Sequence, residues 1–96
     1  MEINEQQLWL NVCTLLEVDP ATVKQPKVVV APDLLSLFGG DSLMYHPGDN
    51  AVLSDGSHDF RQLAHEFAHA VIHQSPKFTE KDTEHIPRWV DEKIWV

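Results

Sequence analysis

The segment from residue 59 to residue 74 constrains the fold most, because it predicts a single helix with marked ends and two unlike faces. Asp59 and Gln62 have the spacing of an N-terminal capping box, and Ser75-Pro76 ends the helix. With a turn of about 100° per residue, one face collects the apolar side chains of Phe60, Leu63, Ala64, Phe67 and Val71. The opposite face collects His65, Glu66, His69 and His73. We therefore expect one face to pack into a core and the other to line a polar site.

The rest of the chain predicts a small α+β domain over residues 1–96. Apolar spacing, turn formers and prolines indicate a helix at 3–18, a strand at 27–31, a short helix at 32–38, a hairpin of 42–45 with 51–54, and a last helix at 88–96. The polar segment 77–85 is expected to be a surface loop. The strand at 51–54 is expected to form the edge of a mixed sheet of about three strands, where an extended peptide can pair with it.

The charge of the chain argues against a nucleic-acid partner. Its formal net charge is -8, whereas a surface that binds nucleic acid needs the opposite sign. No apolar run approaches the ~20 residues that cross a bilayer, and residues 1–5 lack the features of a secretory signal. Cys13 is the single cysteine and lies in an apolar stretch, so we expect a core residue and a reducing, cytoplasmic location. The oligomeric state stays open.

The polar face of the central helix carries His65-Glu66-Phe67-Ala68-His69, an H-E-x-x-H pattern. Residues four apart lie on one side of a helix with Cβ atoms about 6 Å apart. Two imidazoles in these positions can converge on one Zn²⁺ at about 2.0–2.1 Å each. Glu66 then lies beside the metal and can take a proton from a metal-bound water as general base. The pattern also arises by chance among solvated histidines, but the separation of the two faces favours one zinc ion per chain.

A second motif lies in the last helix, where Trp89-Val90-Asp91-Glu92 follows Pro87 and Arg88. Together the two motifs resemble the gluzincins, which pair H-E-x-x-H with a downstream W-x-x-E-G-like helix whose glutamate is the third zinc ligand. The length and the order of elements resemble the minigluzincins, which are small zinc metallopeptidases with a zincin-like fold. This resemblance implies a zincin-like fold and metal ligands at His65, His69 and Glu92. It also implies endopeptidase-type hydrolysis of a peptide or protein substrate, with Glu66 as the catalytic base.

The residue after Glu92 departs from the gluzincin pattern, because Lys93 stands where the family usually has glycine or another small residue. A cation in this position could crowd the cleft, and Trp95-Val96 could fold back into it. The alternative function is therefore a latent or inactive metal-binding protein with a gluzincin-like fold that acts in regulation or partner interaction. The simpler expectation for Trp89 and Trp95 is packing in or at the edge of the core.

Several residues compete for the remaining roles. As the third ligand, His85 ranks after Glu92, whereas His73 lies about 12 Å along the helix from His65, too far to share one ion. Asp91 and Glu84 are candidates to orient the two ligand histidines. A side chain that stabilises the oxyanion is also expected. The sequence leaves five candidates for that role: Tyr45, His46, His58, His73 and His85.

Overall fold

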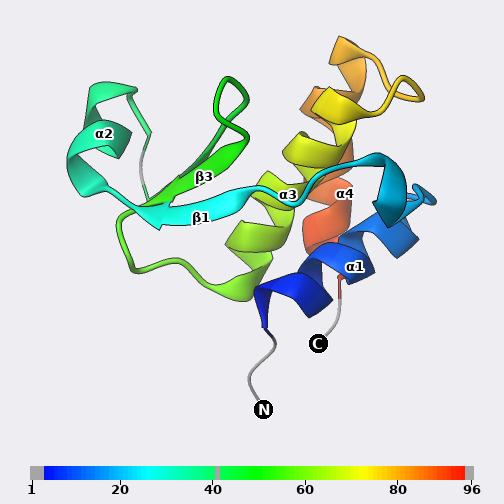
Figure 1. The fold of residues 1–96 in the computed structure, drawn as a ribbon, viewed down its shortest axis with the longest axis horizontal. Coiled ribbons are helices and arrows are strands. Elements are labelled where there is room, and N and C mark those ends of the chain that lie inside the picture. The colour runs from blue at the N-terminus through cyan, green and yellow to red at the C-terminus, as the bar shows by residue number, and fades with distance from the viewer. Residues whose placement is uncertain (1–3, 41, 95–96) are drawn as a thin grey trace.

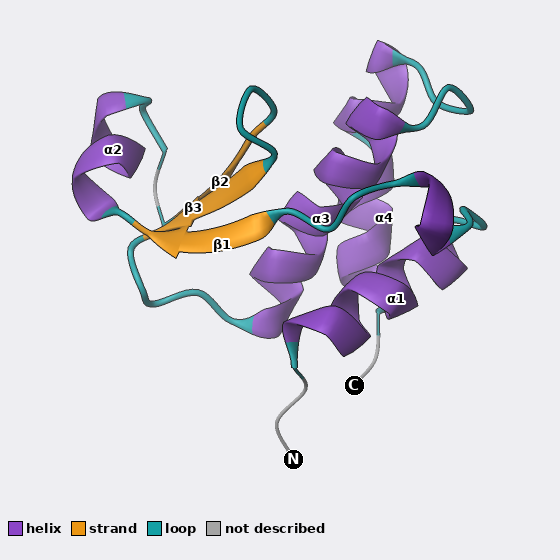
Figure 2. Cartoon of the chain, viewed as in Figure 1, coloured by secondary structure: helices purple, strands orange, loops and turns teal. Residues whose placement is uncertain are grey.

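The computed structural model describes residues 4–40 and 42–94. In this part of the chain, four α-helices and three strands follow one another as α1 (Glu5–Leu15), β1 (Lys27–Val30), α2 (Pro32–Leu37), β2 (Leu43–His46), β3 (Ala51–Ser54), α3 (Phe60–Gln74) and α4 (Ile86–Lys93). Two short 3-10 helices, η1 (Pro20–Thr22) and η2 (Glu80–Glu84), lie in the connections. The predicted α+β class is confirmed, and α1, α3 and α4 lie together on one side of the sheet (Figures 1 and 2).

The helix ends follow from local capping. The predicted capping box of α3 is present, because Asp59 accepts from the Gln62 backbone N–H and Gln62 accepts from the Asp59 N–H, both at 2.9 Å. Helix α1 starts at a capping side chain, Asn4, and is shorter than the predicted helix at 3–18. Glu17 has a φ of 57°, in the left-handed region, so the chain leaves the helix before it reaches Asp19.

The sheet has the order β1-β3-β2, so the prediction that 51–54 forms its edge is wrong. Strand β3 pairs in parallel with β1 and antiparallel with β2, and all four of its residues are buried. The hairpin was predicted correctly, but β1 adds to the free side of β3 and thereby encloses it. The two edges of this mixed sheet are β1 and β2, and β2 is the strand that lies against α3.

The core lies between the sheet and the three helices. Trp9 of α1 and Phe67 of α3 meet edge to face with ring centroids 5.4 Å apart. Cys13 is fully buried beside them, as predicted, and burial raises the pKa of its thiol to about 11, with a smaller effect of the Asp19 carboxylate. The thiol therefore stays protonated and packs as a small apolar group.

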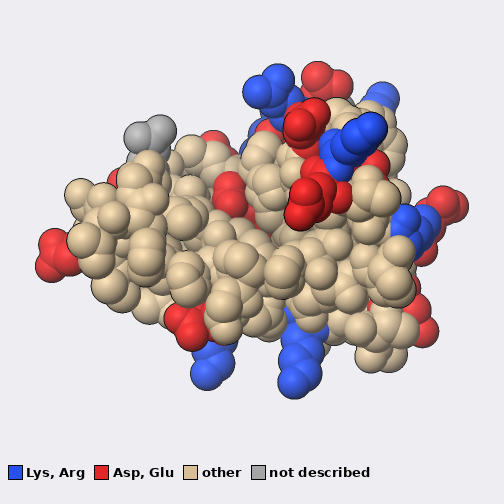
Figure 3. All heavy atoms as spheres, turned by 90° about the horizontal axis from the view of Figure 1, so that it is seen from above, with Lys and Arg blue, Asp and Glu red and all other residues tan. Residues whose placement is uncertain are grey.

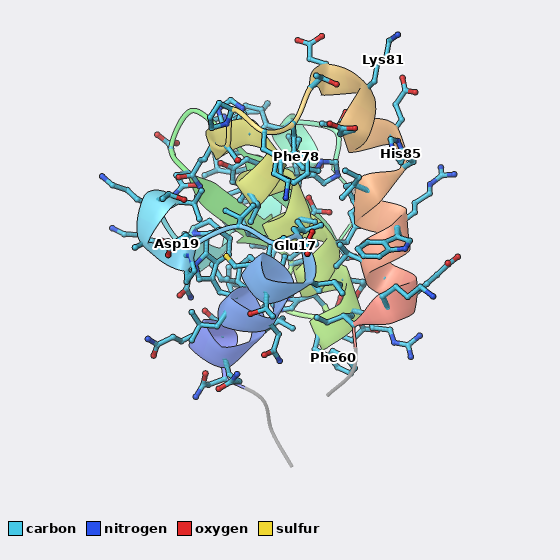
Figure 4. The ribbon with its side chains drawn as sticks, turned by 90° about the vertical axis from the view of Figure 1, so that its right-hand side faces the viewer. Glu17, Asp19, Phe60, Phe78, Lys81 and His85 are labelled. Atoms are coloured by element: carbon cyan, nitrogen blue, oxygen red, sulfur yellow. The ribbon has the colours of Figure 1, made fainter. Side chains whose placement is uncertain are left out.

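Phe60 was assigned to the core face of its helix incorrectly, whereas Trp89 is partly exposed, in keeping with the expected packing at the edge of the core. Phe60 is 39% exposed, because it is the first residue of α3 and points away from the molecule at the lower end of Figure 4. Trp89 is 41% exposed. Helix α4 buries Pro87 and Val90, which leaves Trp89 on the outer face of that helix. Trp95 and Val96 lie outside the described residues.

The segment 77–85, predicted as a loop, contains η2, which a capping box between Thr79 and Asp82 begins. Lys81 and His85 project from this end of the molecule (Figure 4). The last helix begins at Ile86, slightly earlier than predicted, with Pro87 in its first turn. Within the described ranges, no helix has the length and apolarity needed to cross a membrane.

Candidate metal centre

His65 and His69 lie one turn apart on α3, and their Nε2 atoms are 3.3 Å from each other. Two nitrogens bound to one tetrahedral zinc at about 2.0–2.1 Å would be about 3.3–3.4 Å apart. Both imidazoles are partly buried, and their ring centroids are 5.0 Å apart. The structure therefore brings these two side chains together at the separation that a shared ion requires.

Glu66 joins the two histidines in a group whose potential ligand atoms all lie within 4.8 Å of one another. Its Oε1 accepts a hydrogen bond of 2.8 Å from the backbone N–H of Tyr45 on β2. The carboxylate is thus held between the helix and the edge strand. Sequence reasoning missed this contact, because the donor is a main-chain group and leaves no signature in residue type.

The protonation states at this group follow mainly from burial. Burial raises the pKa of Glu66, and the nearby Asp91 carboxylate adds to this, while the Tyr45 N–H and His65 act in the opposite direction. Burial, helped by His65, lowers the pKa of His69 to about 4. His69 is therefore neutral at pH 7, which is the form that binds a metal.

Asp91 of α4 contacts the far side of the His65 ring. Its Oδ2 lies 2.8 Å from Nδ1 of His65, which leaves Nε2 facing His69. A carboxylate in this position orients a metal-binding imidazole and makes it more basic. The other predicted orienting residue, Glu84, is exposed on η2.

The second oxygen of Asp91, Oδ1, is buried and has no hydrogen-bond partner. A buried polar atom without a partner costs about 1–3 kcal/mol. A cation or an ordered water at this place would remove that cost. The donor set that lies within 4.8 Å consists of two imidazoles and the Glu66 carboxylate, and nitrogen and oxygen donors of this kind fit a divalent ion such as Zn²⁺.

Glu92 is exposed on α4, next to Asp91. It lines a cavity of about 510 Å³ that His65 and Glu66 also line. It is not one of the three residues whose ligand atoms lie within 4.8 Å of one another. The structure thus places Glu92 in the lining of the same cavity and outside the three-residue group.

A second cavity of about 420 Å³ lies on the other side of Glu66. Its lining includes His69, His73, Tyr45 and Thr83. Since Glu66 lines both cavities, the three-residue group stands between two hollows rather than at the end of one. An extended ligand that fills both would contact Glu66.

The remaining predicted residues either line this cavity or lie away from the three-residue group. Of the five candidates for the oxyanion role, only Tyr45 and His73 line the second cavity. The Tyr45 hydroxyl donates to Asn50 at 2.8 Å, which turns it toward the hairpin. His58 contacts the Ser54 hydroxyl at 2.6 Å and secures the loop before α3. His85 is mostly exposed, 3.9 Å from Asp82, and is not part of the three-residue group.

Comparison of the chain with protein-family models, with curated proteins and with solved structures found no match. The resemblance of the two motifs to the minigluzincins therefore stays a prediction.

Proposed function

We propose that this chain is a zinc metallopeptidase of the gluzincin type with a zincin-like fold. In this proposal His65, His69 and Glu92 hold one zinc ion, and Glu66 is the general base. The observation that carries it is the 3.3 Å separation of the two Nε2 atoms with the Glu66 carboxylate beside them. A solvated pair of surface histidines has no reason to hold this geometry around a partly buried glutamate.

Glu92 is a better third ligand than its neighbour. Asp91 contacts Nδ1 of His65, and an imidazole that binds a metal through Nε2 presents Nδ1 on the opposite side of its ring. Asp91 is therefore placed to orient the ligand rather than to share the ion. Glu92 has the longer side chain and already lines the cavity in front of His65.

The chemistry proposed for the chain's own residues centres on Glu66. When bound, the zinc ion would polarise the scissile carbonyl and lower the pKa of water to about 7. Glu66 takes the proton of the attacking water and passes it to the leaving amine. The Tyr45 N–H orients its carboxylate, and burial raises the pKa of that carboxyl toward the range in which it can both accept and release a proton.

The proposed substrate is an extended peptide segment that pairs with β2. The main-chain carbonyl of Ser42 accepts a hydrogen bond from the Asp55 N–H of the loop after β3. The backbone N–H of Tyr45 points the other way and donates to the Glu66 carboxylate. Because neighbouring residues of a strand alternate in direction, the main-chain groups of Leu43 and Tyr45 face away from β3. Main-chain pairing with Leu43 and with the Tyr45 carbonyl would lay a peptide beside Glu66 and into both cavities, while the Tyr45 N–H stays on Glu66.

A metal-binding protein without turnover is the second candidate, and one observation favours it. The Tyr45 N–H, which a peptide paired along the whole of β2 would need, already donates to Glu66. In this state the hydrogen bond between β2 and Glu66 occupies both the strand's donor and the proposed base. A partner that separated them would then be required for activity.

Zinc content of the purified protein and two variants tests the site. Near one zinc per chain in the wild type, a marked loss in Glu92→Ala and a smaller loss in Asp91→Ala would support the ligand assignment. The reverse order would make Asp91 the ligand. No zinc in the wild type after incubation with the metal would overturn the proposal. Zinc bound without cleavage of a mixed peptide library would favour the second candidate.

A further inference from the structure

The edge of the sheet remote from the metal centre has unpaired main-chain groups. Lys27 donates to the Asn50 carbonyl at 3.2 Å, and Ala31 donates to the Ser54 carbonyl at 2.9 Å. Alternate residues of β1 therefore bond to β3, and the N–H and C=O groups of Val28 and Val30 face outward. In the described part of the chain, no group hydrogen-bonds to these outward positions.

Apolar side chains surround this edge. Of the eight large apolar side chains that are exposed in the described residues, five lie between residues 29 and 38: Val29, Val30, Leu34, Leu37 and Phe38. Val30 is 64% exposed and Leu37 is 76% exposed. We call residues 27–38 the β1–α2 surface. Seen from above, the charged side chains gather toward the η2 end, and the region over α2 and the sheet is mostly uncharged (Figure 3). Folded proteins rarely leave such an edge open.

We propose that the β1–α2 surface binds a second copy of this chain, through an antiparallel pair of β1 strands centred on Val29. In this arrangement Val28 lies opposite the second copy's Val30, and the reverse holds by symmetry. The outward N–H and C=O groups of Val28 and Val30 in both copies then all form hydrogen bonds across the interface. The pattern is self-complementary, as a two-fold interface requires.

Charge favours a second copy over an unrelated strand. The β1–α2 surface contains two charged residues of opposite sign, Lys27 and Asp33. Pairing centred on Val29 sets Lys27 opposite the second copy's Ala31, beside the start of its α2, where Asp33 is exposed. Two symmetric ion pairs result. The surface itself is neutral, so pairing there brings no net charge of like sign into contact, although each chain carries a net charge of -8.

The extent of the surface sets the expected strength. A standard interface buries about 800 Å² per partner from ~20–30 residues a side. The β1–α2 surface contains fewer residues than a standard interface, so we expect a weak dimer with a Kd of about 1–100 µM. It leaves the metal centre open, because β3 separates β1 from β2.

Sedimentation of the full chain over about 1 µM to 1 mM tests this range of affinity. The average mass should rise from 10.9 kDa toward twice that value. Val30→Lys should raise the Kd at least ~10-fold, since lysine on an edge strand opposes pairing. Leu10→Lys is the matched control, because it adds the same cation at an exposed apolar position on α1 and should dimerise like the wild type. Circular dichroism melts would check that both variants fold.

The register of the proposed β1 pair, centred on Val29, is tested by exchanging the charges of Lys27 and Asp33. Lys27→Glu and Asp33→Lys should each weaken the dimer, and the double variant should restore it. A monomeric mass at every concentration would overturn the proposal. So would dimers that persist unchanged in Val30→Lys, or a double variant no stronger than the single ones.

Discussion

The backbone N–H of Tyr45 lies 2.8 Å from Oε1 of Glu66, so the edge strand of the sheet and the H-E-x-x-H helix meet at the proposed catalytic base. This contact helps to fix the position of β2 relative to α3. It also gives Glu66 a donor that offsets part of the cost of its burial. The base is therefore positioned by the fold before any ligand arrives.

Glu66→Gln should abolish peptide cleavage and leave zinc binding intact. The amide oxygen of glutamine can still accept from the Tyr45 N–H, so the strand keeps its position. It cannot take a proton from water, and we expect a loss of at least ~10³-fold in kcat. Zinc content and cleavage of a peptide library would be measured on the same sample. Glu84→Gln, at an exposed position on η2, is the matched control and should behave as wild type. Full activity in Glu66→Gln would remove Glu66 from the mechanism.

Asp91 should set the affinity for zinc in a graded way. Asp91→Asn keeps an acceptor for Nδ1 of His65 but loses the charge, so zinc affinity should fall by roughly 10-fold. Asp91→Ala also frees the ring to rotate, and affinity should fall by up to about 100-fold. Competition with a chromogenic chelator would give these constants. Asp49→Asn, which changes an exposed carboxylate near His46, should leave them unchanged. Equal affinities in all three variants would show that Asp91 has no orienting role.

Local patterns predicted the helix, its capping box and the hairpin, because neighbouring residues decide these features. The order of the strands depends on how β1 reaches the free side of β3, and no local signal carries it. The sequence also left Asp91 and Glu84 as alternatives for the carboxylate that orients the histidines, and the structure shows Asp91 against His65. Which of two adjacent carboxylates meets His65 depends on the rotation of α4, and the burial of Val90 sets that rotation.

The metal-free protein should lose stability as the pH falls from about 6.5 to about 4. The pKa of His69 is lowered to about 4 in the fold, against 6.5 for the free side chain, so the unfolded chain binds a proton first in this window. Because the ring is partly exposed, we expect a loss of only about 1–2 kcal/mol. Glu66 has the opposite effect on stability. Because its pKa is raised in the fold, the native state binds its proton first, and this favours the folded state as the pH falls.

A comparison of Glu66→Gln with Glu66→Gln/His69→Gln isolates the histidine. Urea unfolding of both variants at pH 7 and pH 4.5, with a chelator present, would give the two changes in the free energy of unfolding. The variant that retains His69 should lose about 1–2 kcal/mol more than the other. Equal losses of unfolding free energy in the two variants would show that the burial of His69 does not contribute to the pH dependence of stability.

Helix α4 should couple core packing to metal binding. Val90 is fully buried on this helix, and Asp91 and Glu92 follow it directly. Val90→Ala removes two methyl groups from the contact with α3 and should cost about 1–3 kcal/mol in the free energy of unfolding. The loosened helix should also hold Asp91 less firmly against His65, so zinc affinity should fall although no ligand has changed. Trp89→Ala is the matched control, because Trp89 lies on the outer face of the same helix and its loss should change both quantities less. Urea unfolding and chelator competition would measure the two effects. If Val90→Ala lowered stability but left zinc affinity as in the wild type, the position of α4 would not govern the metal centre.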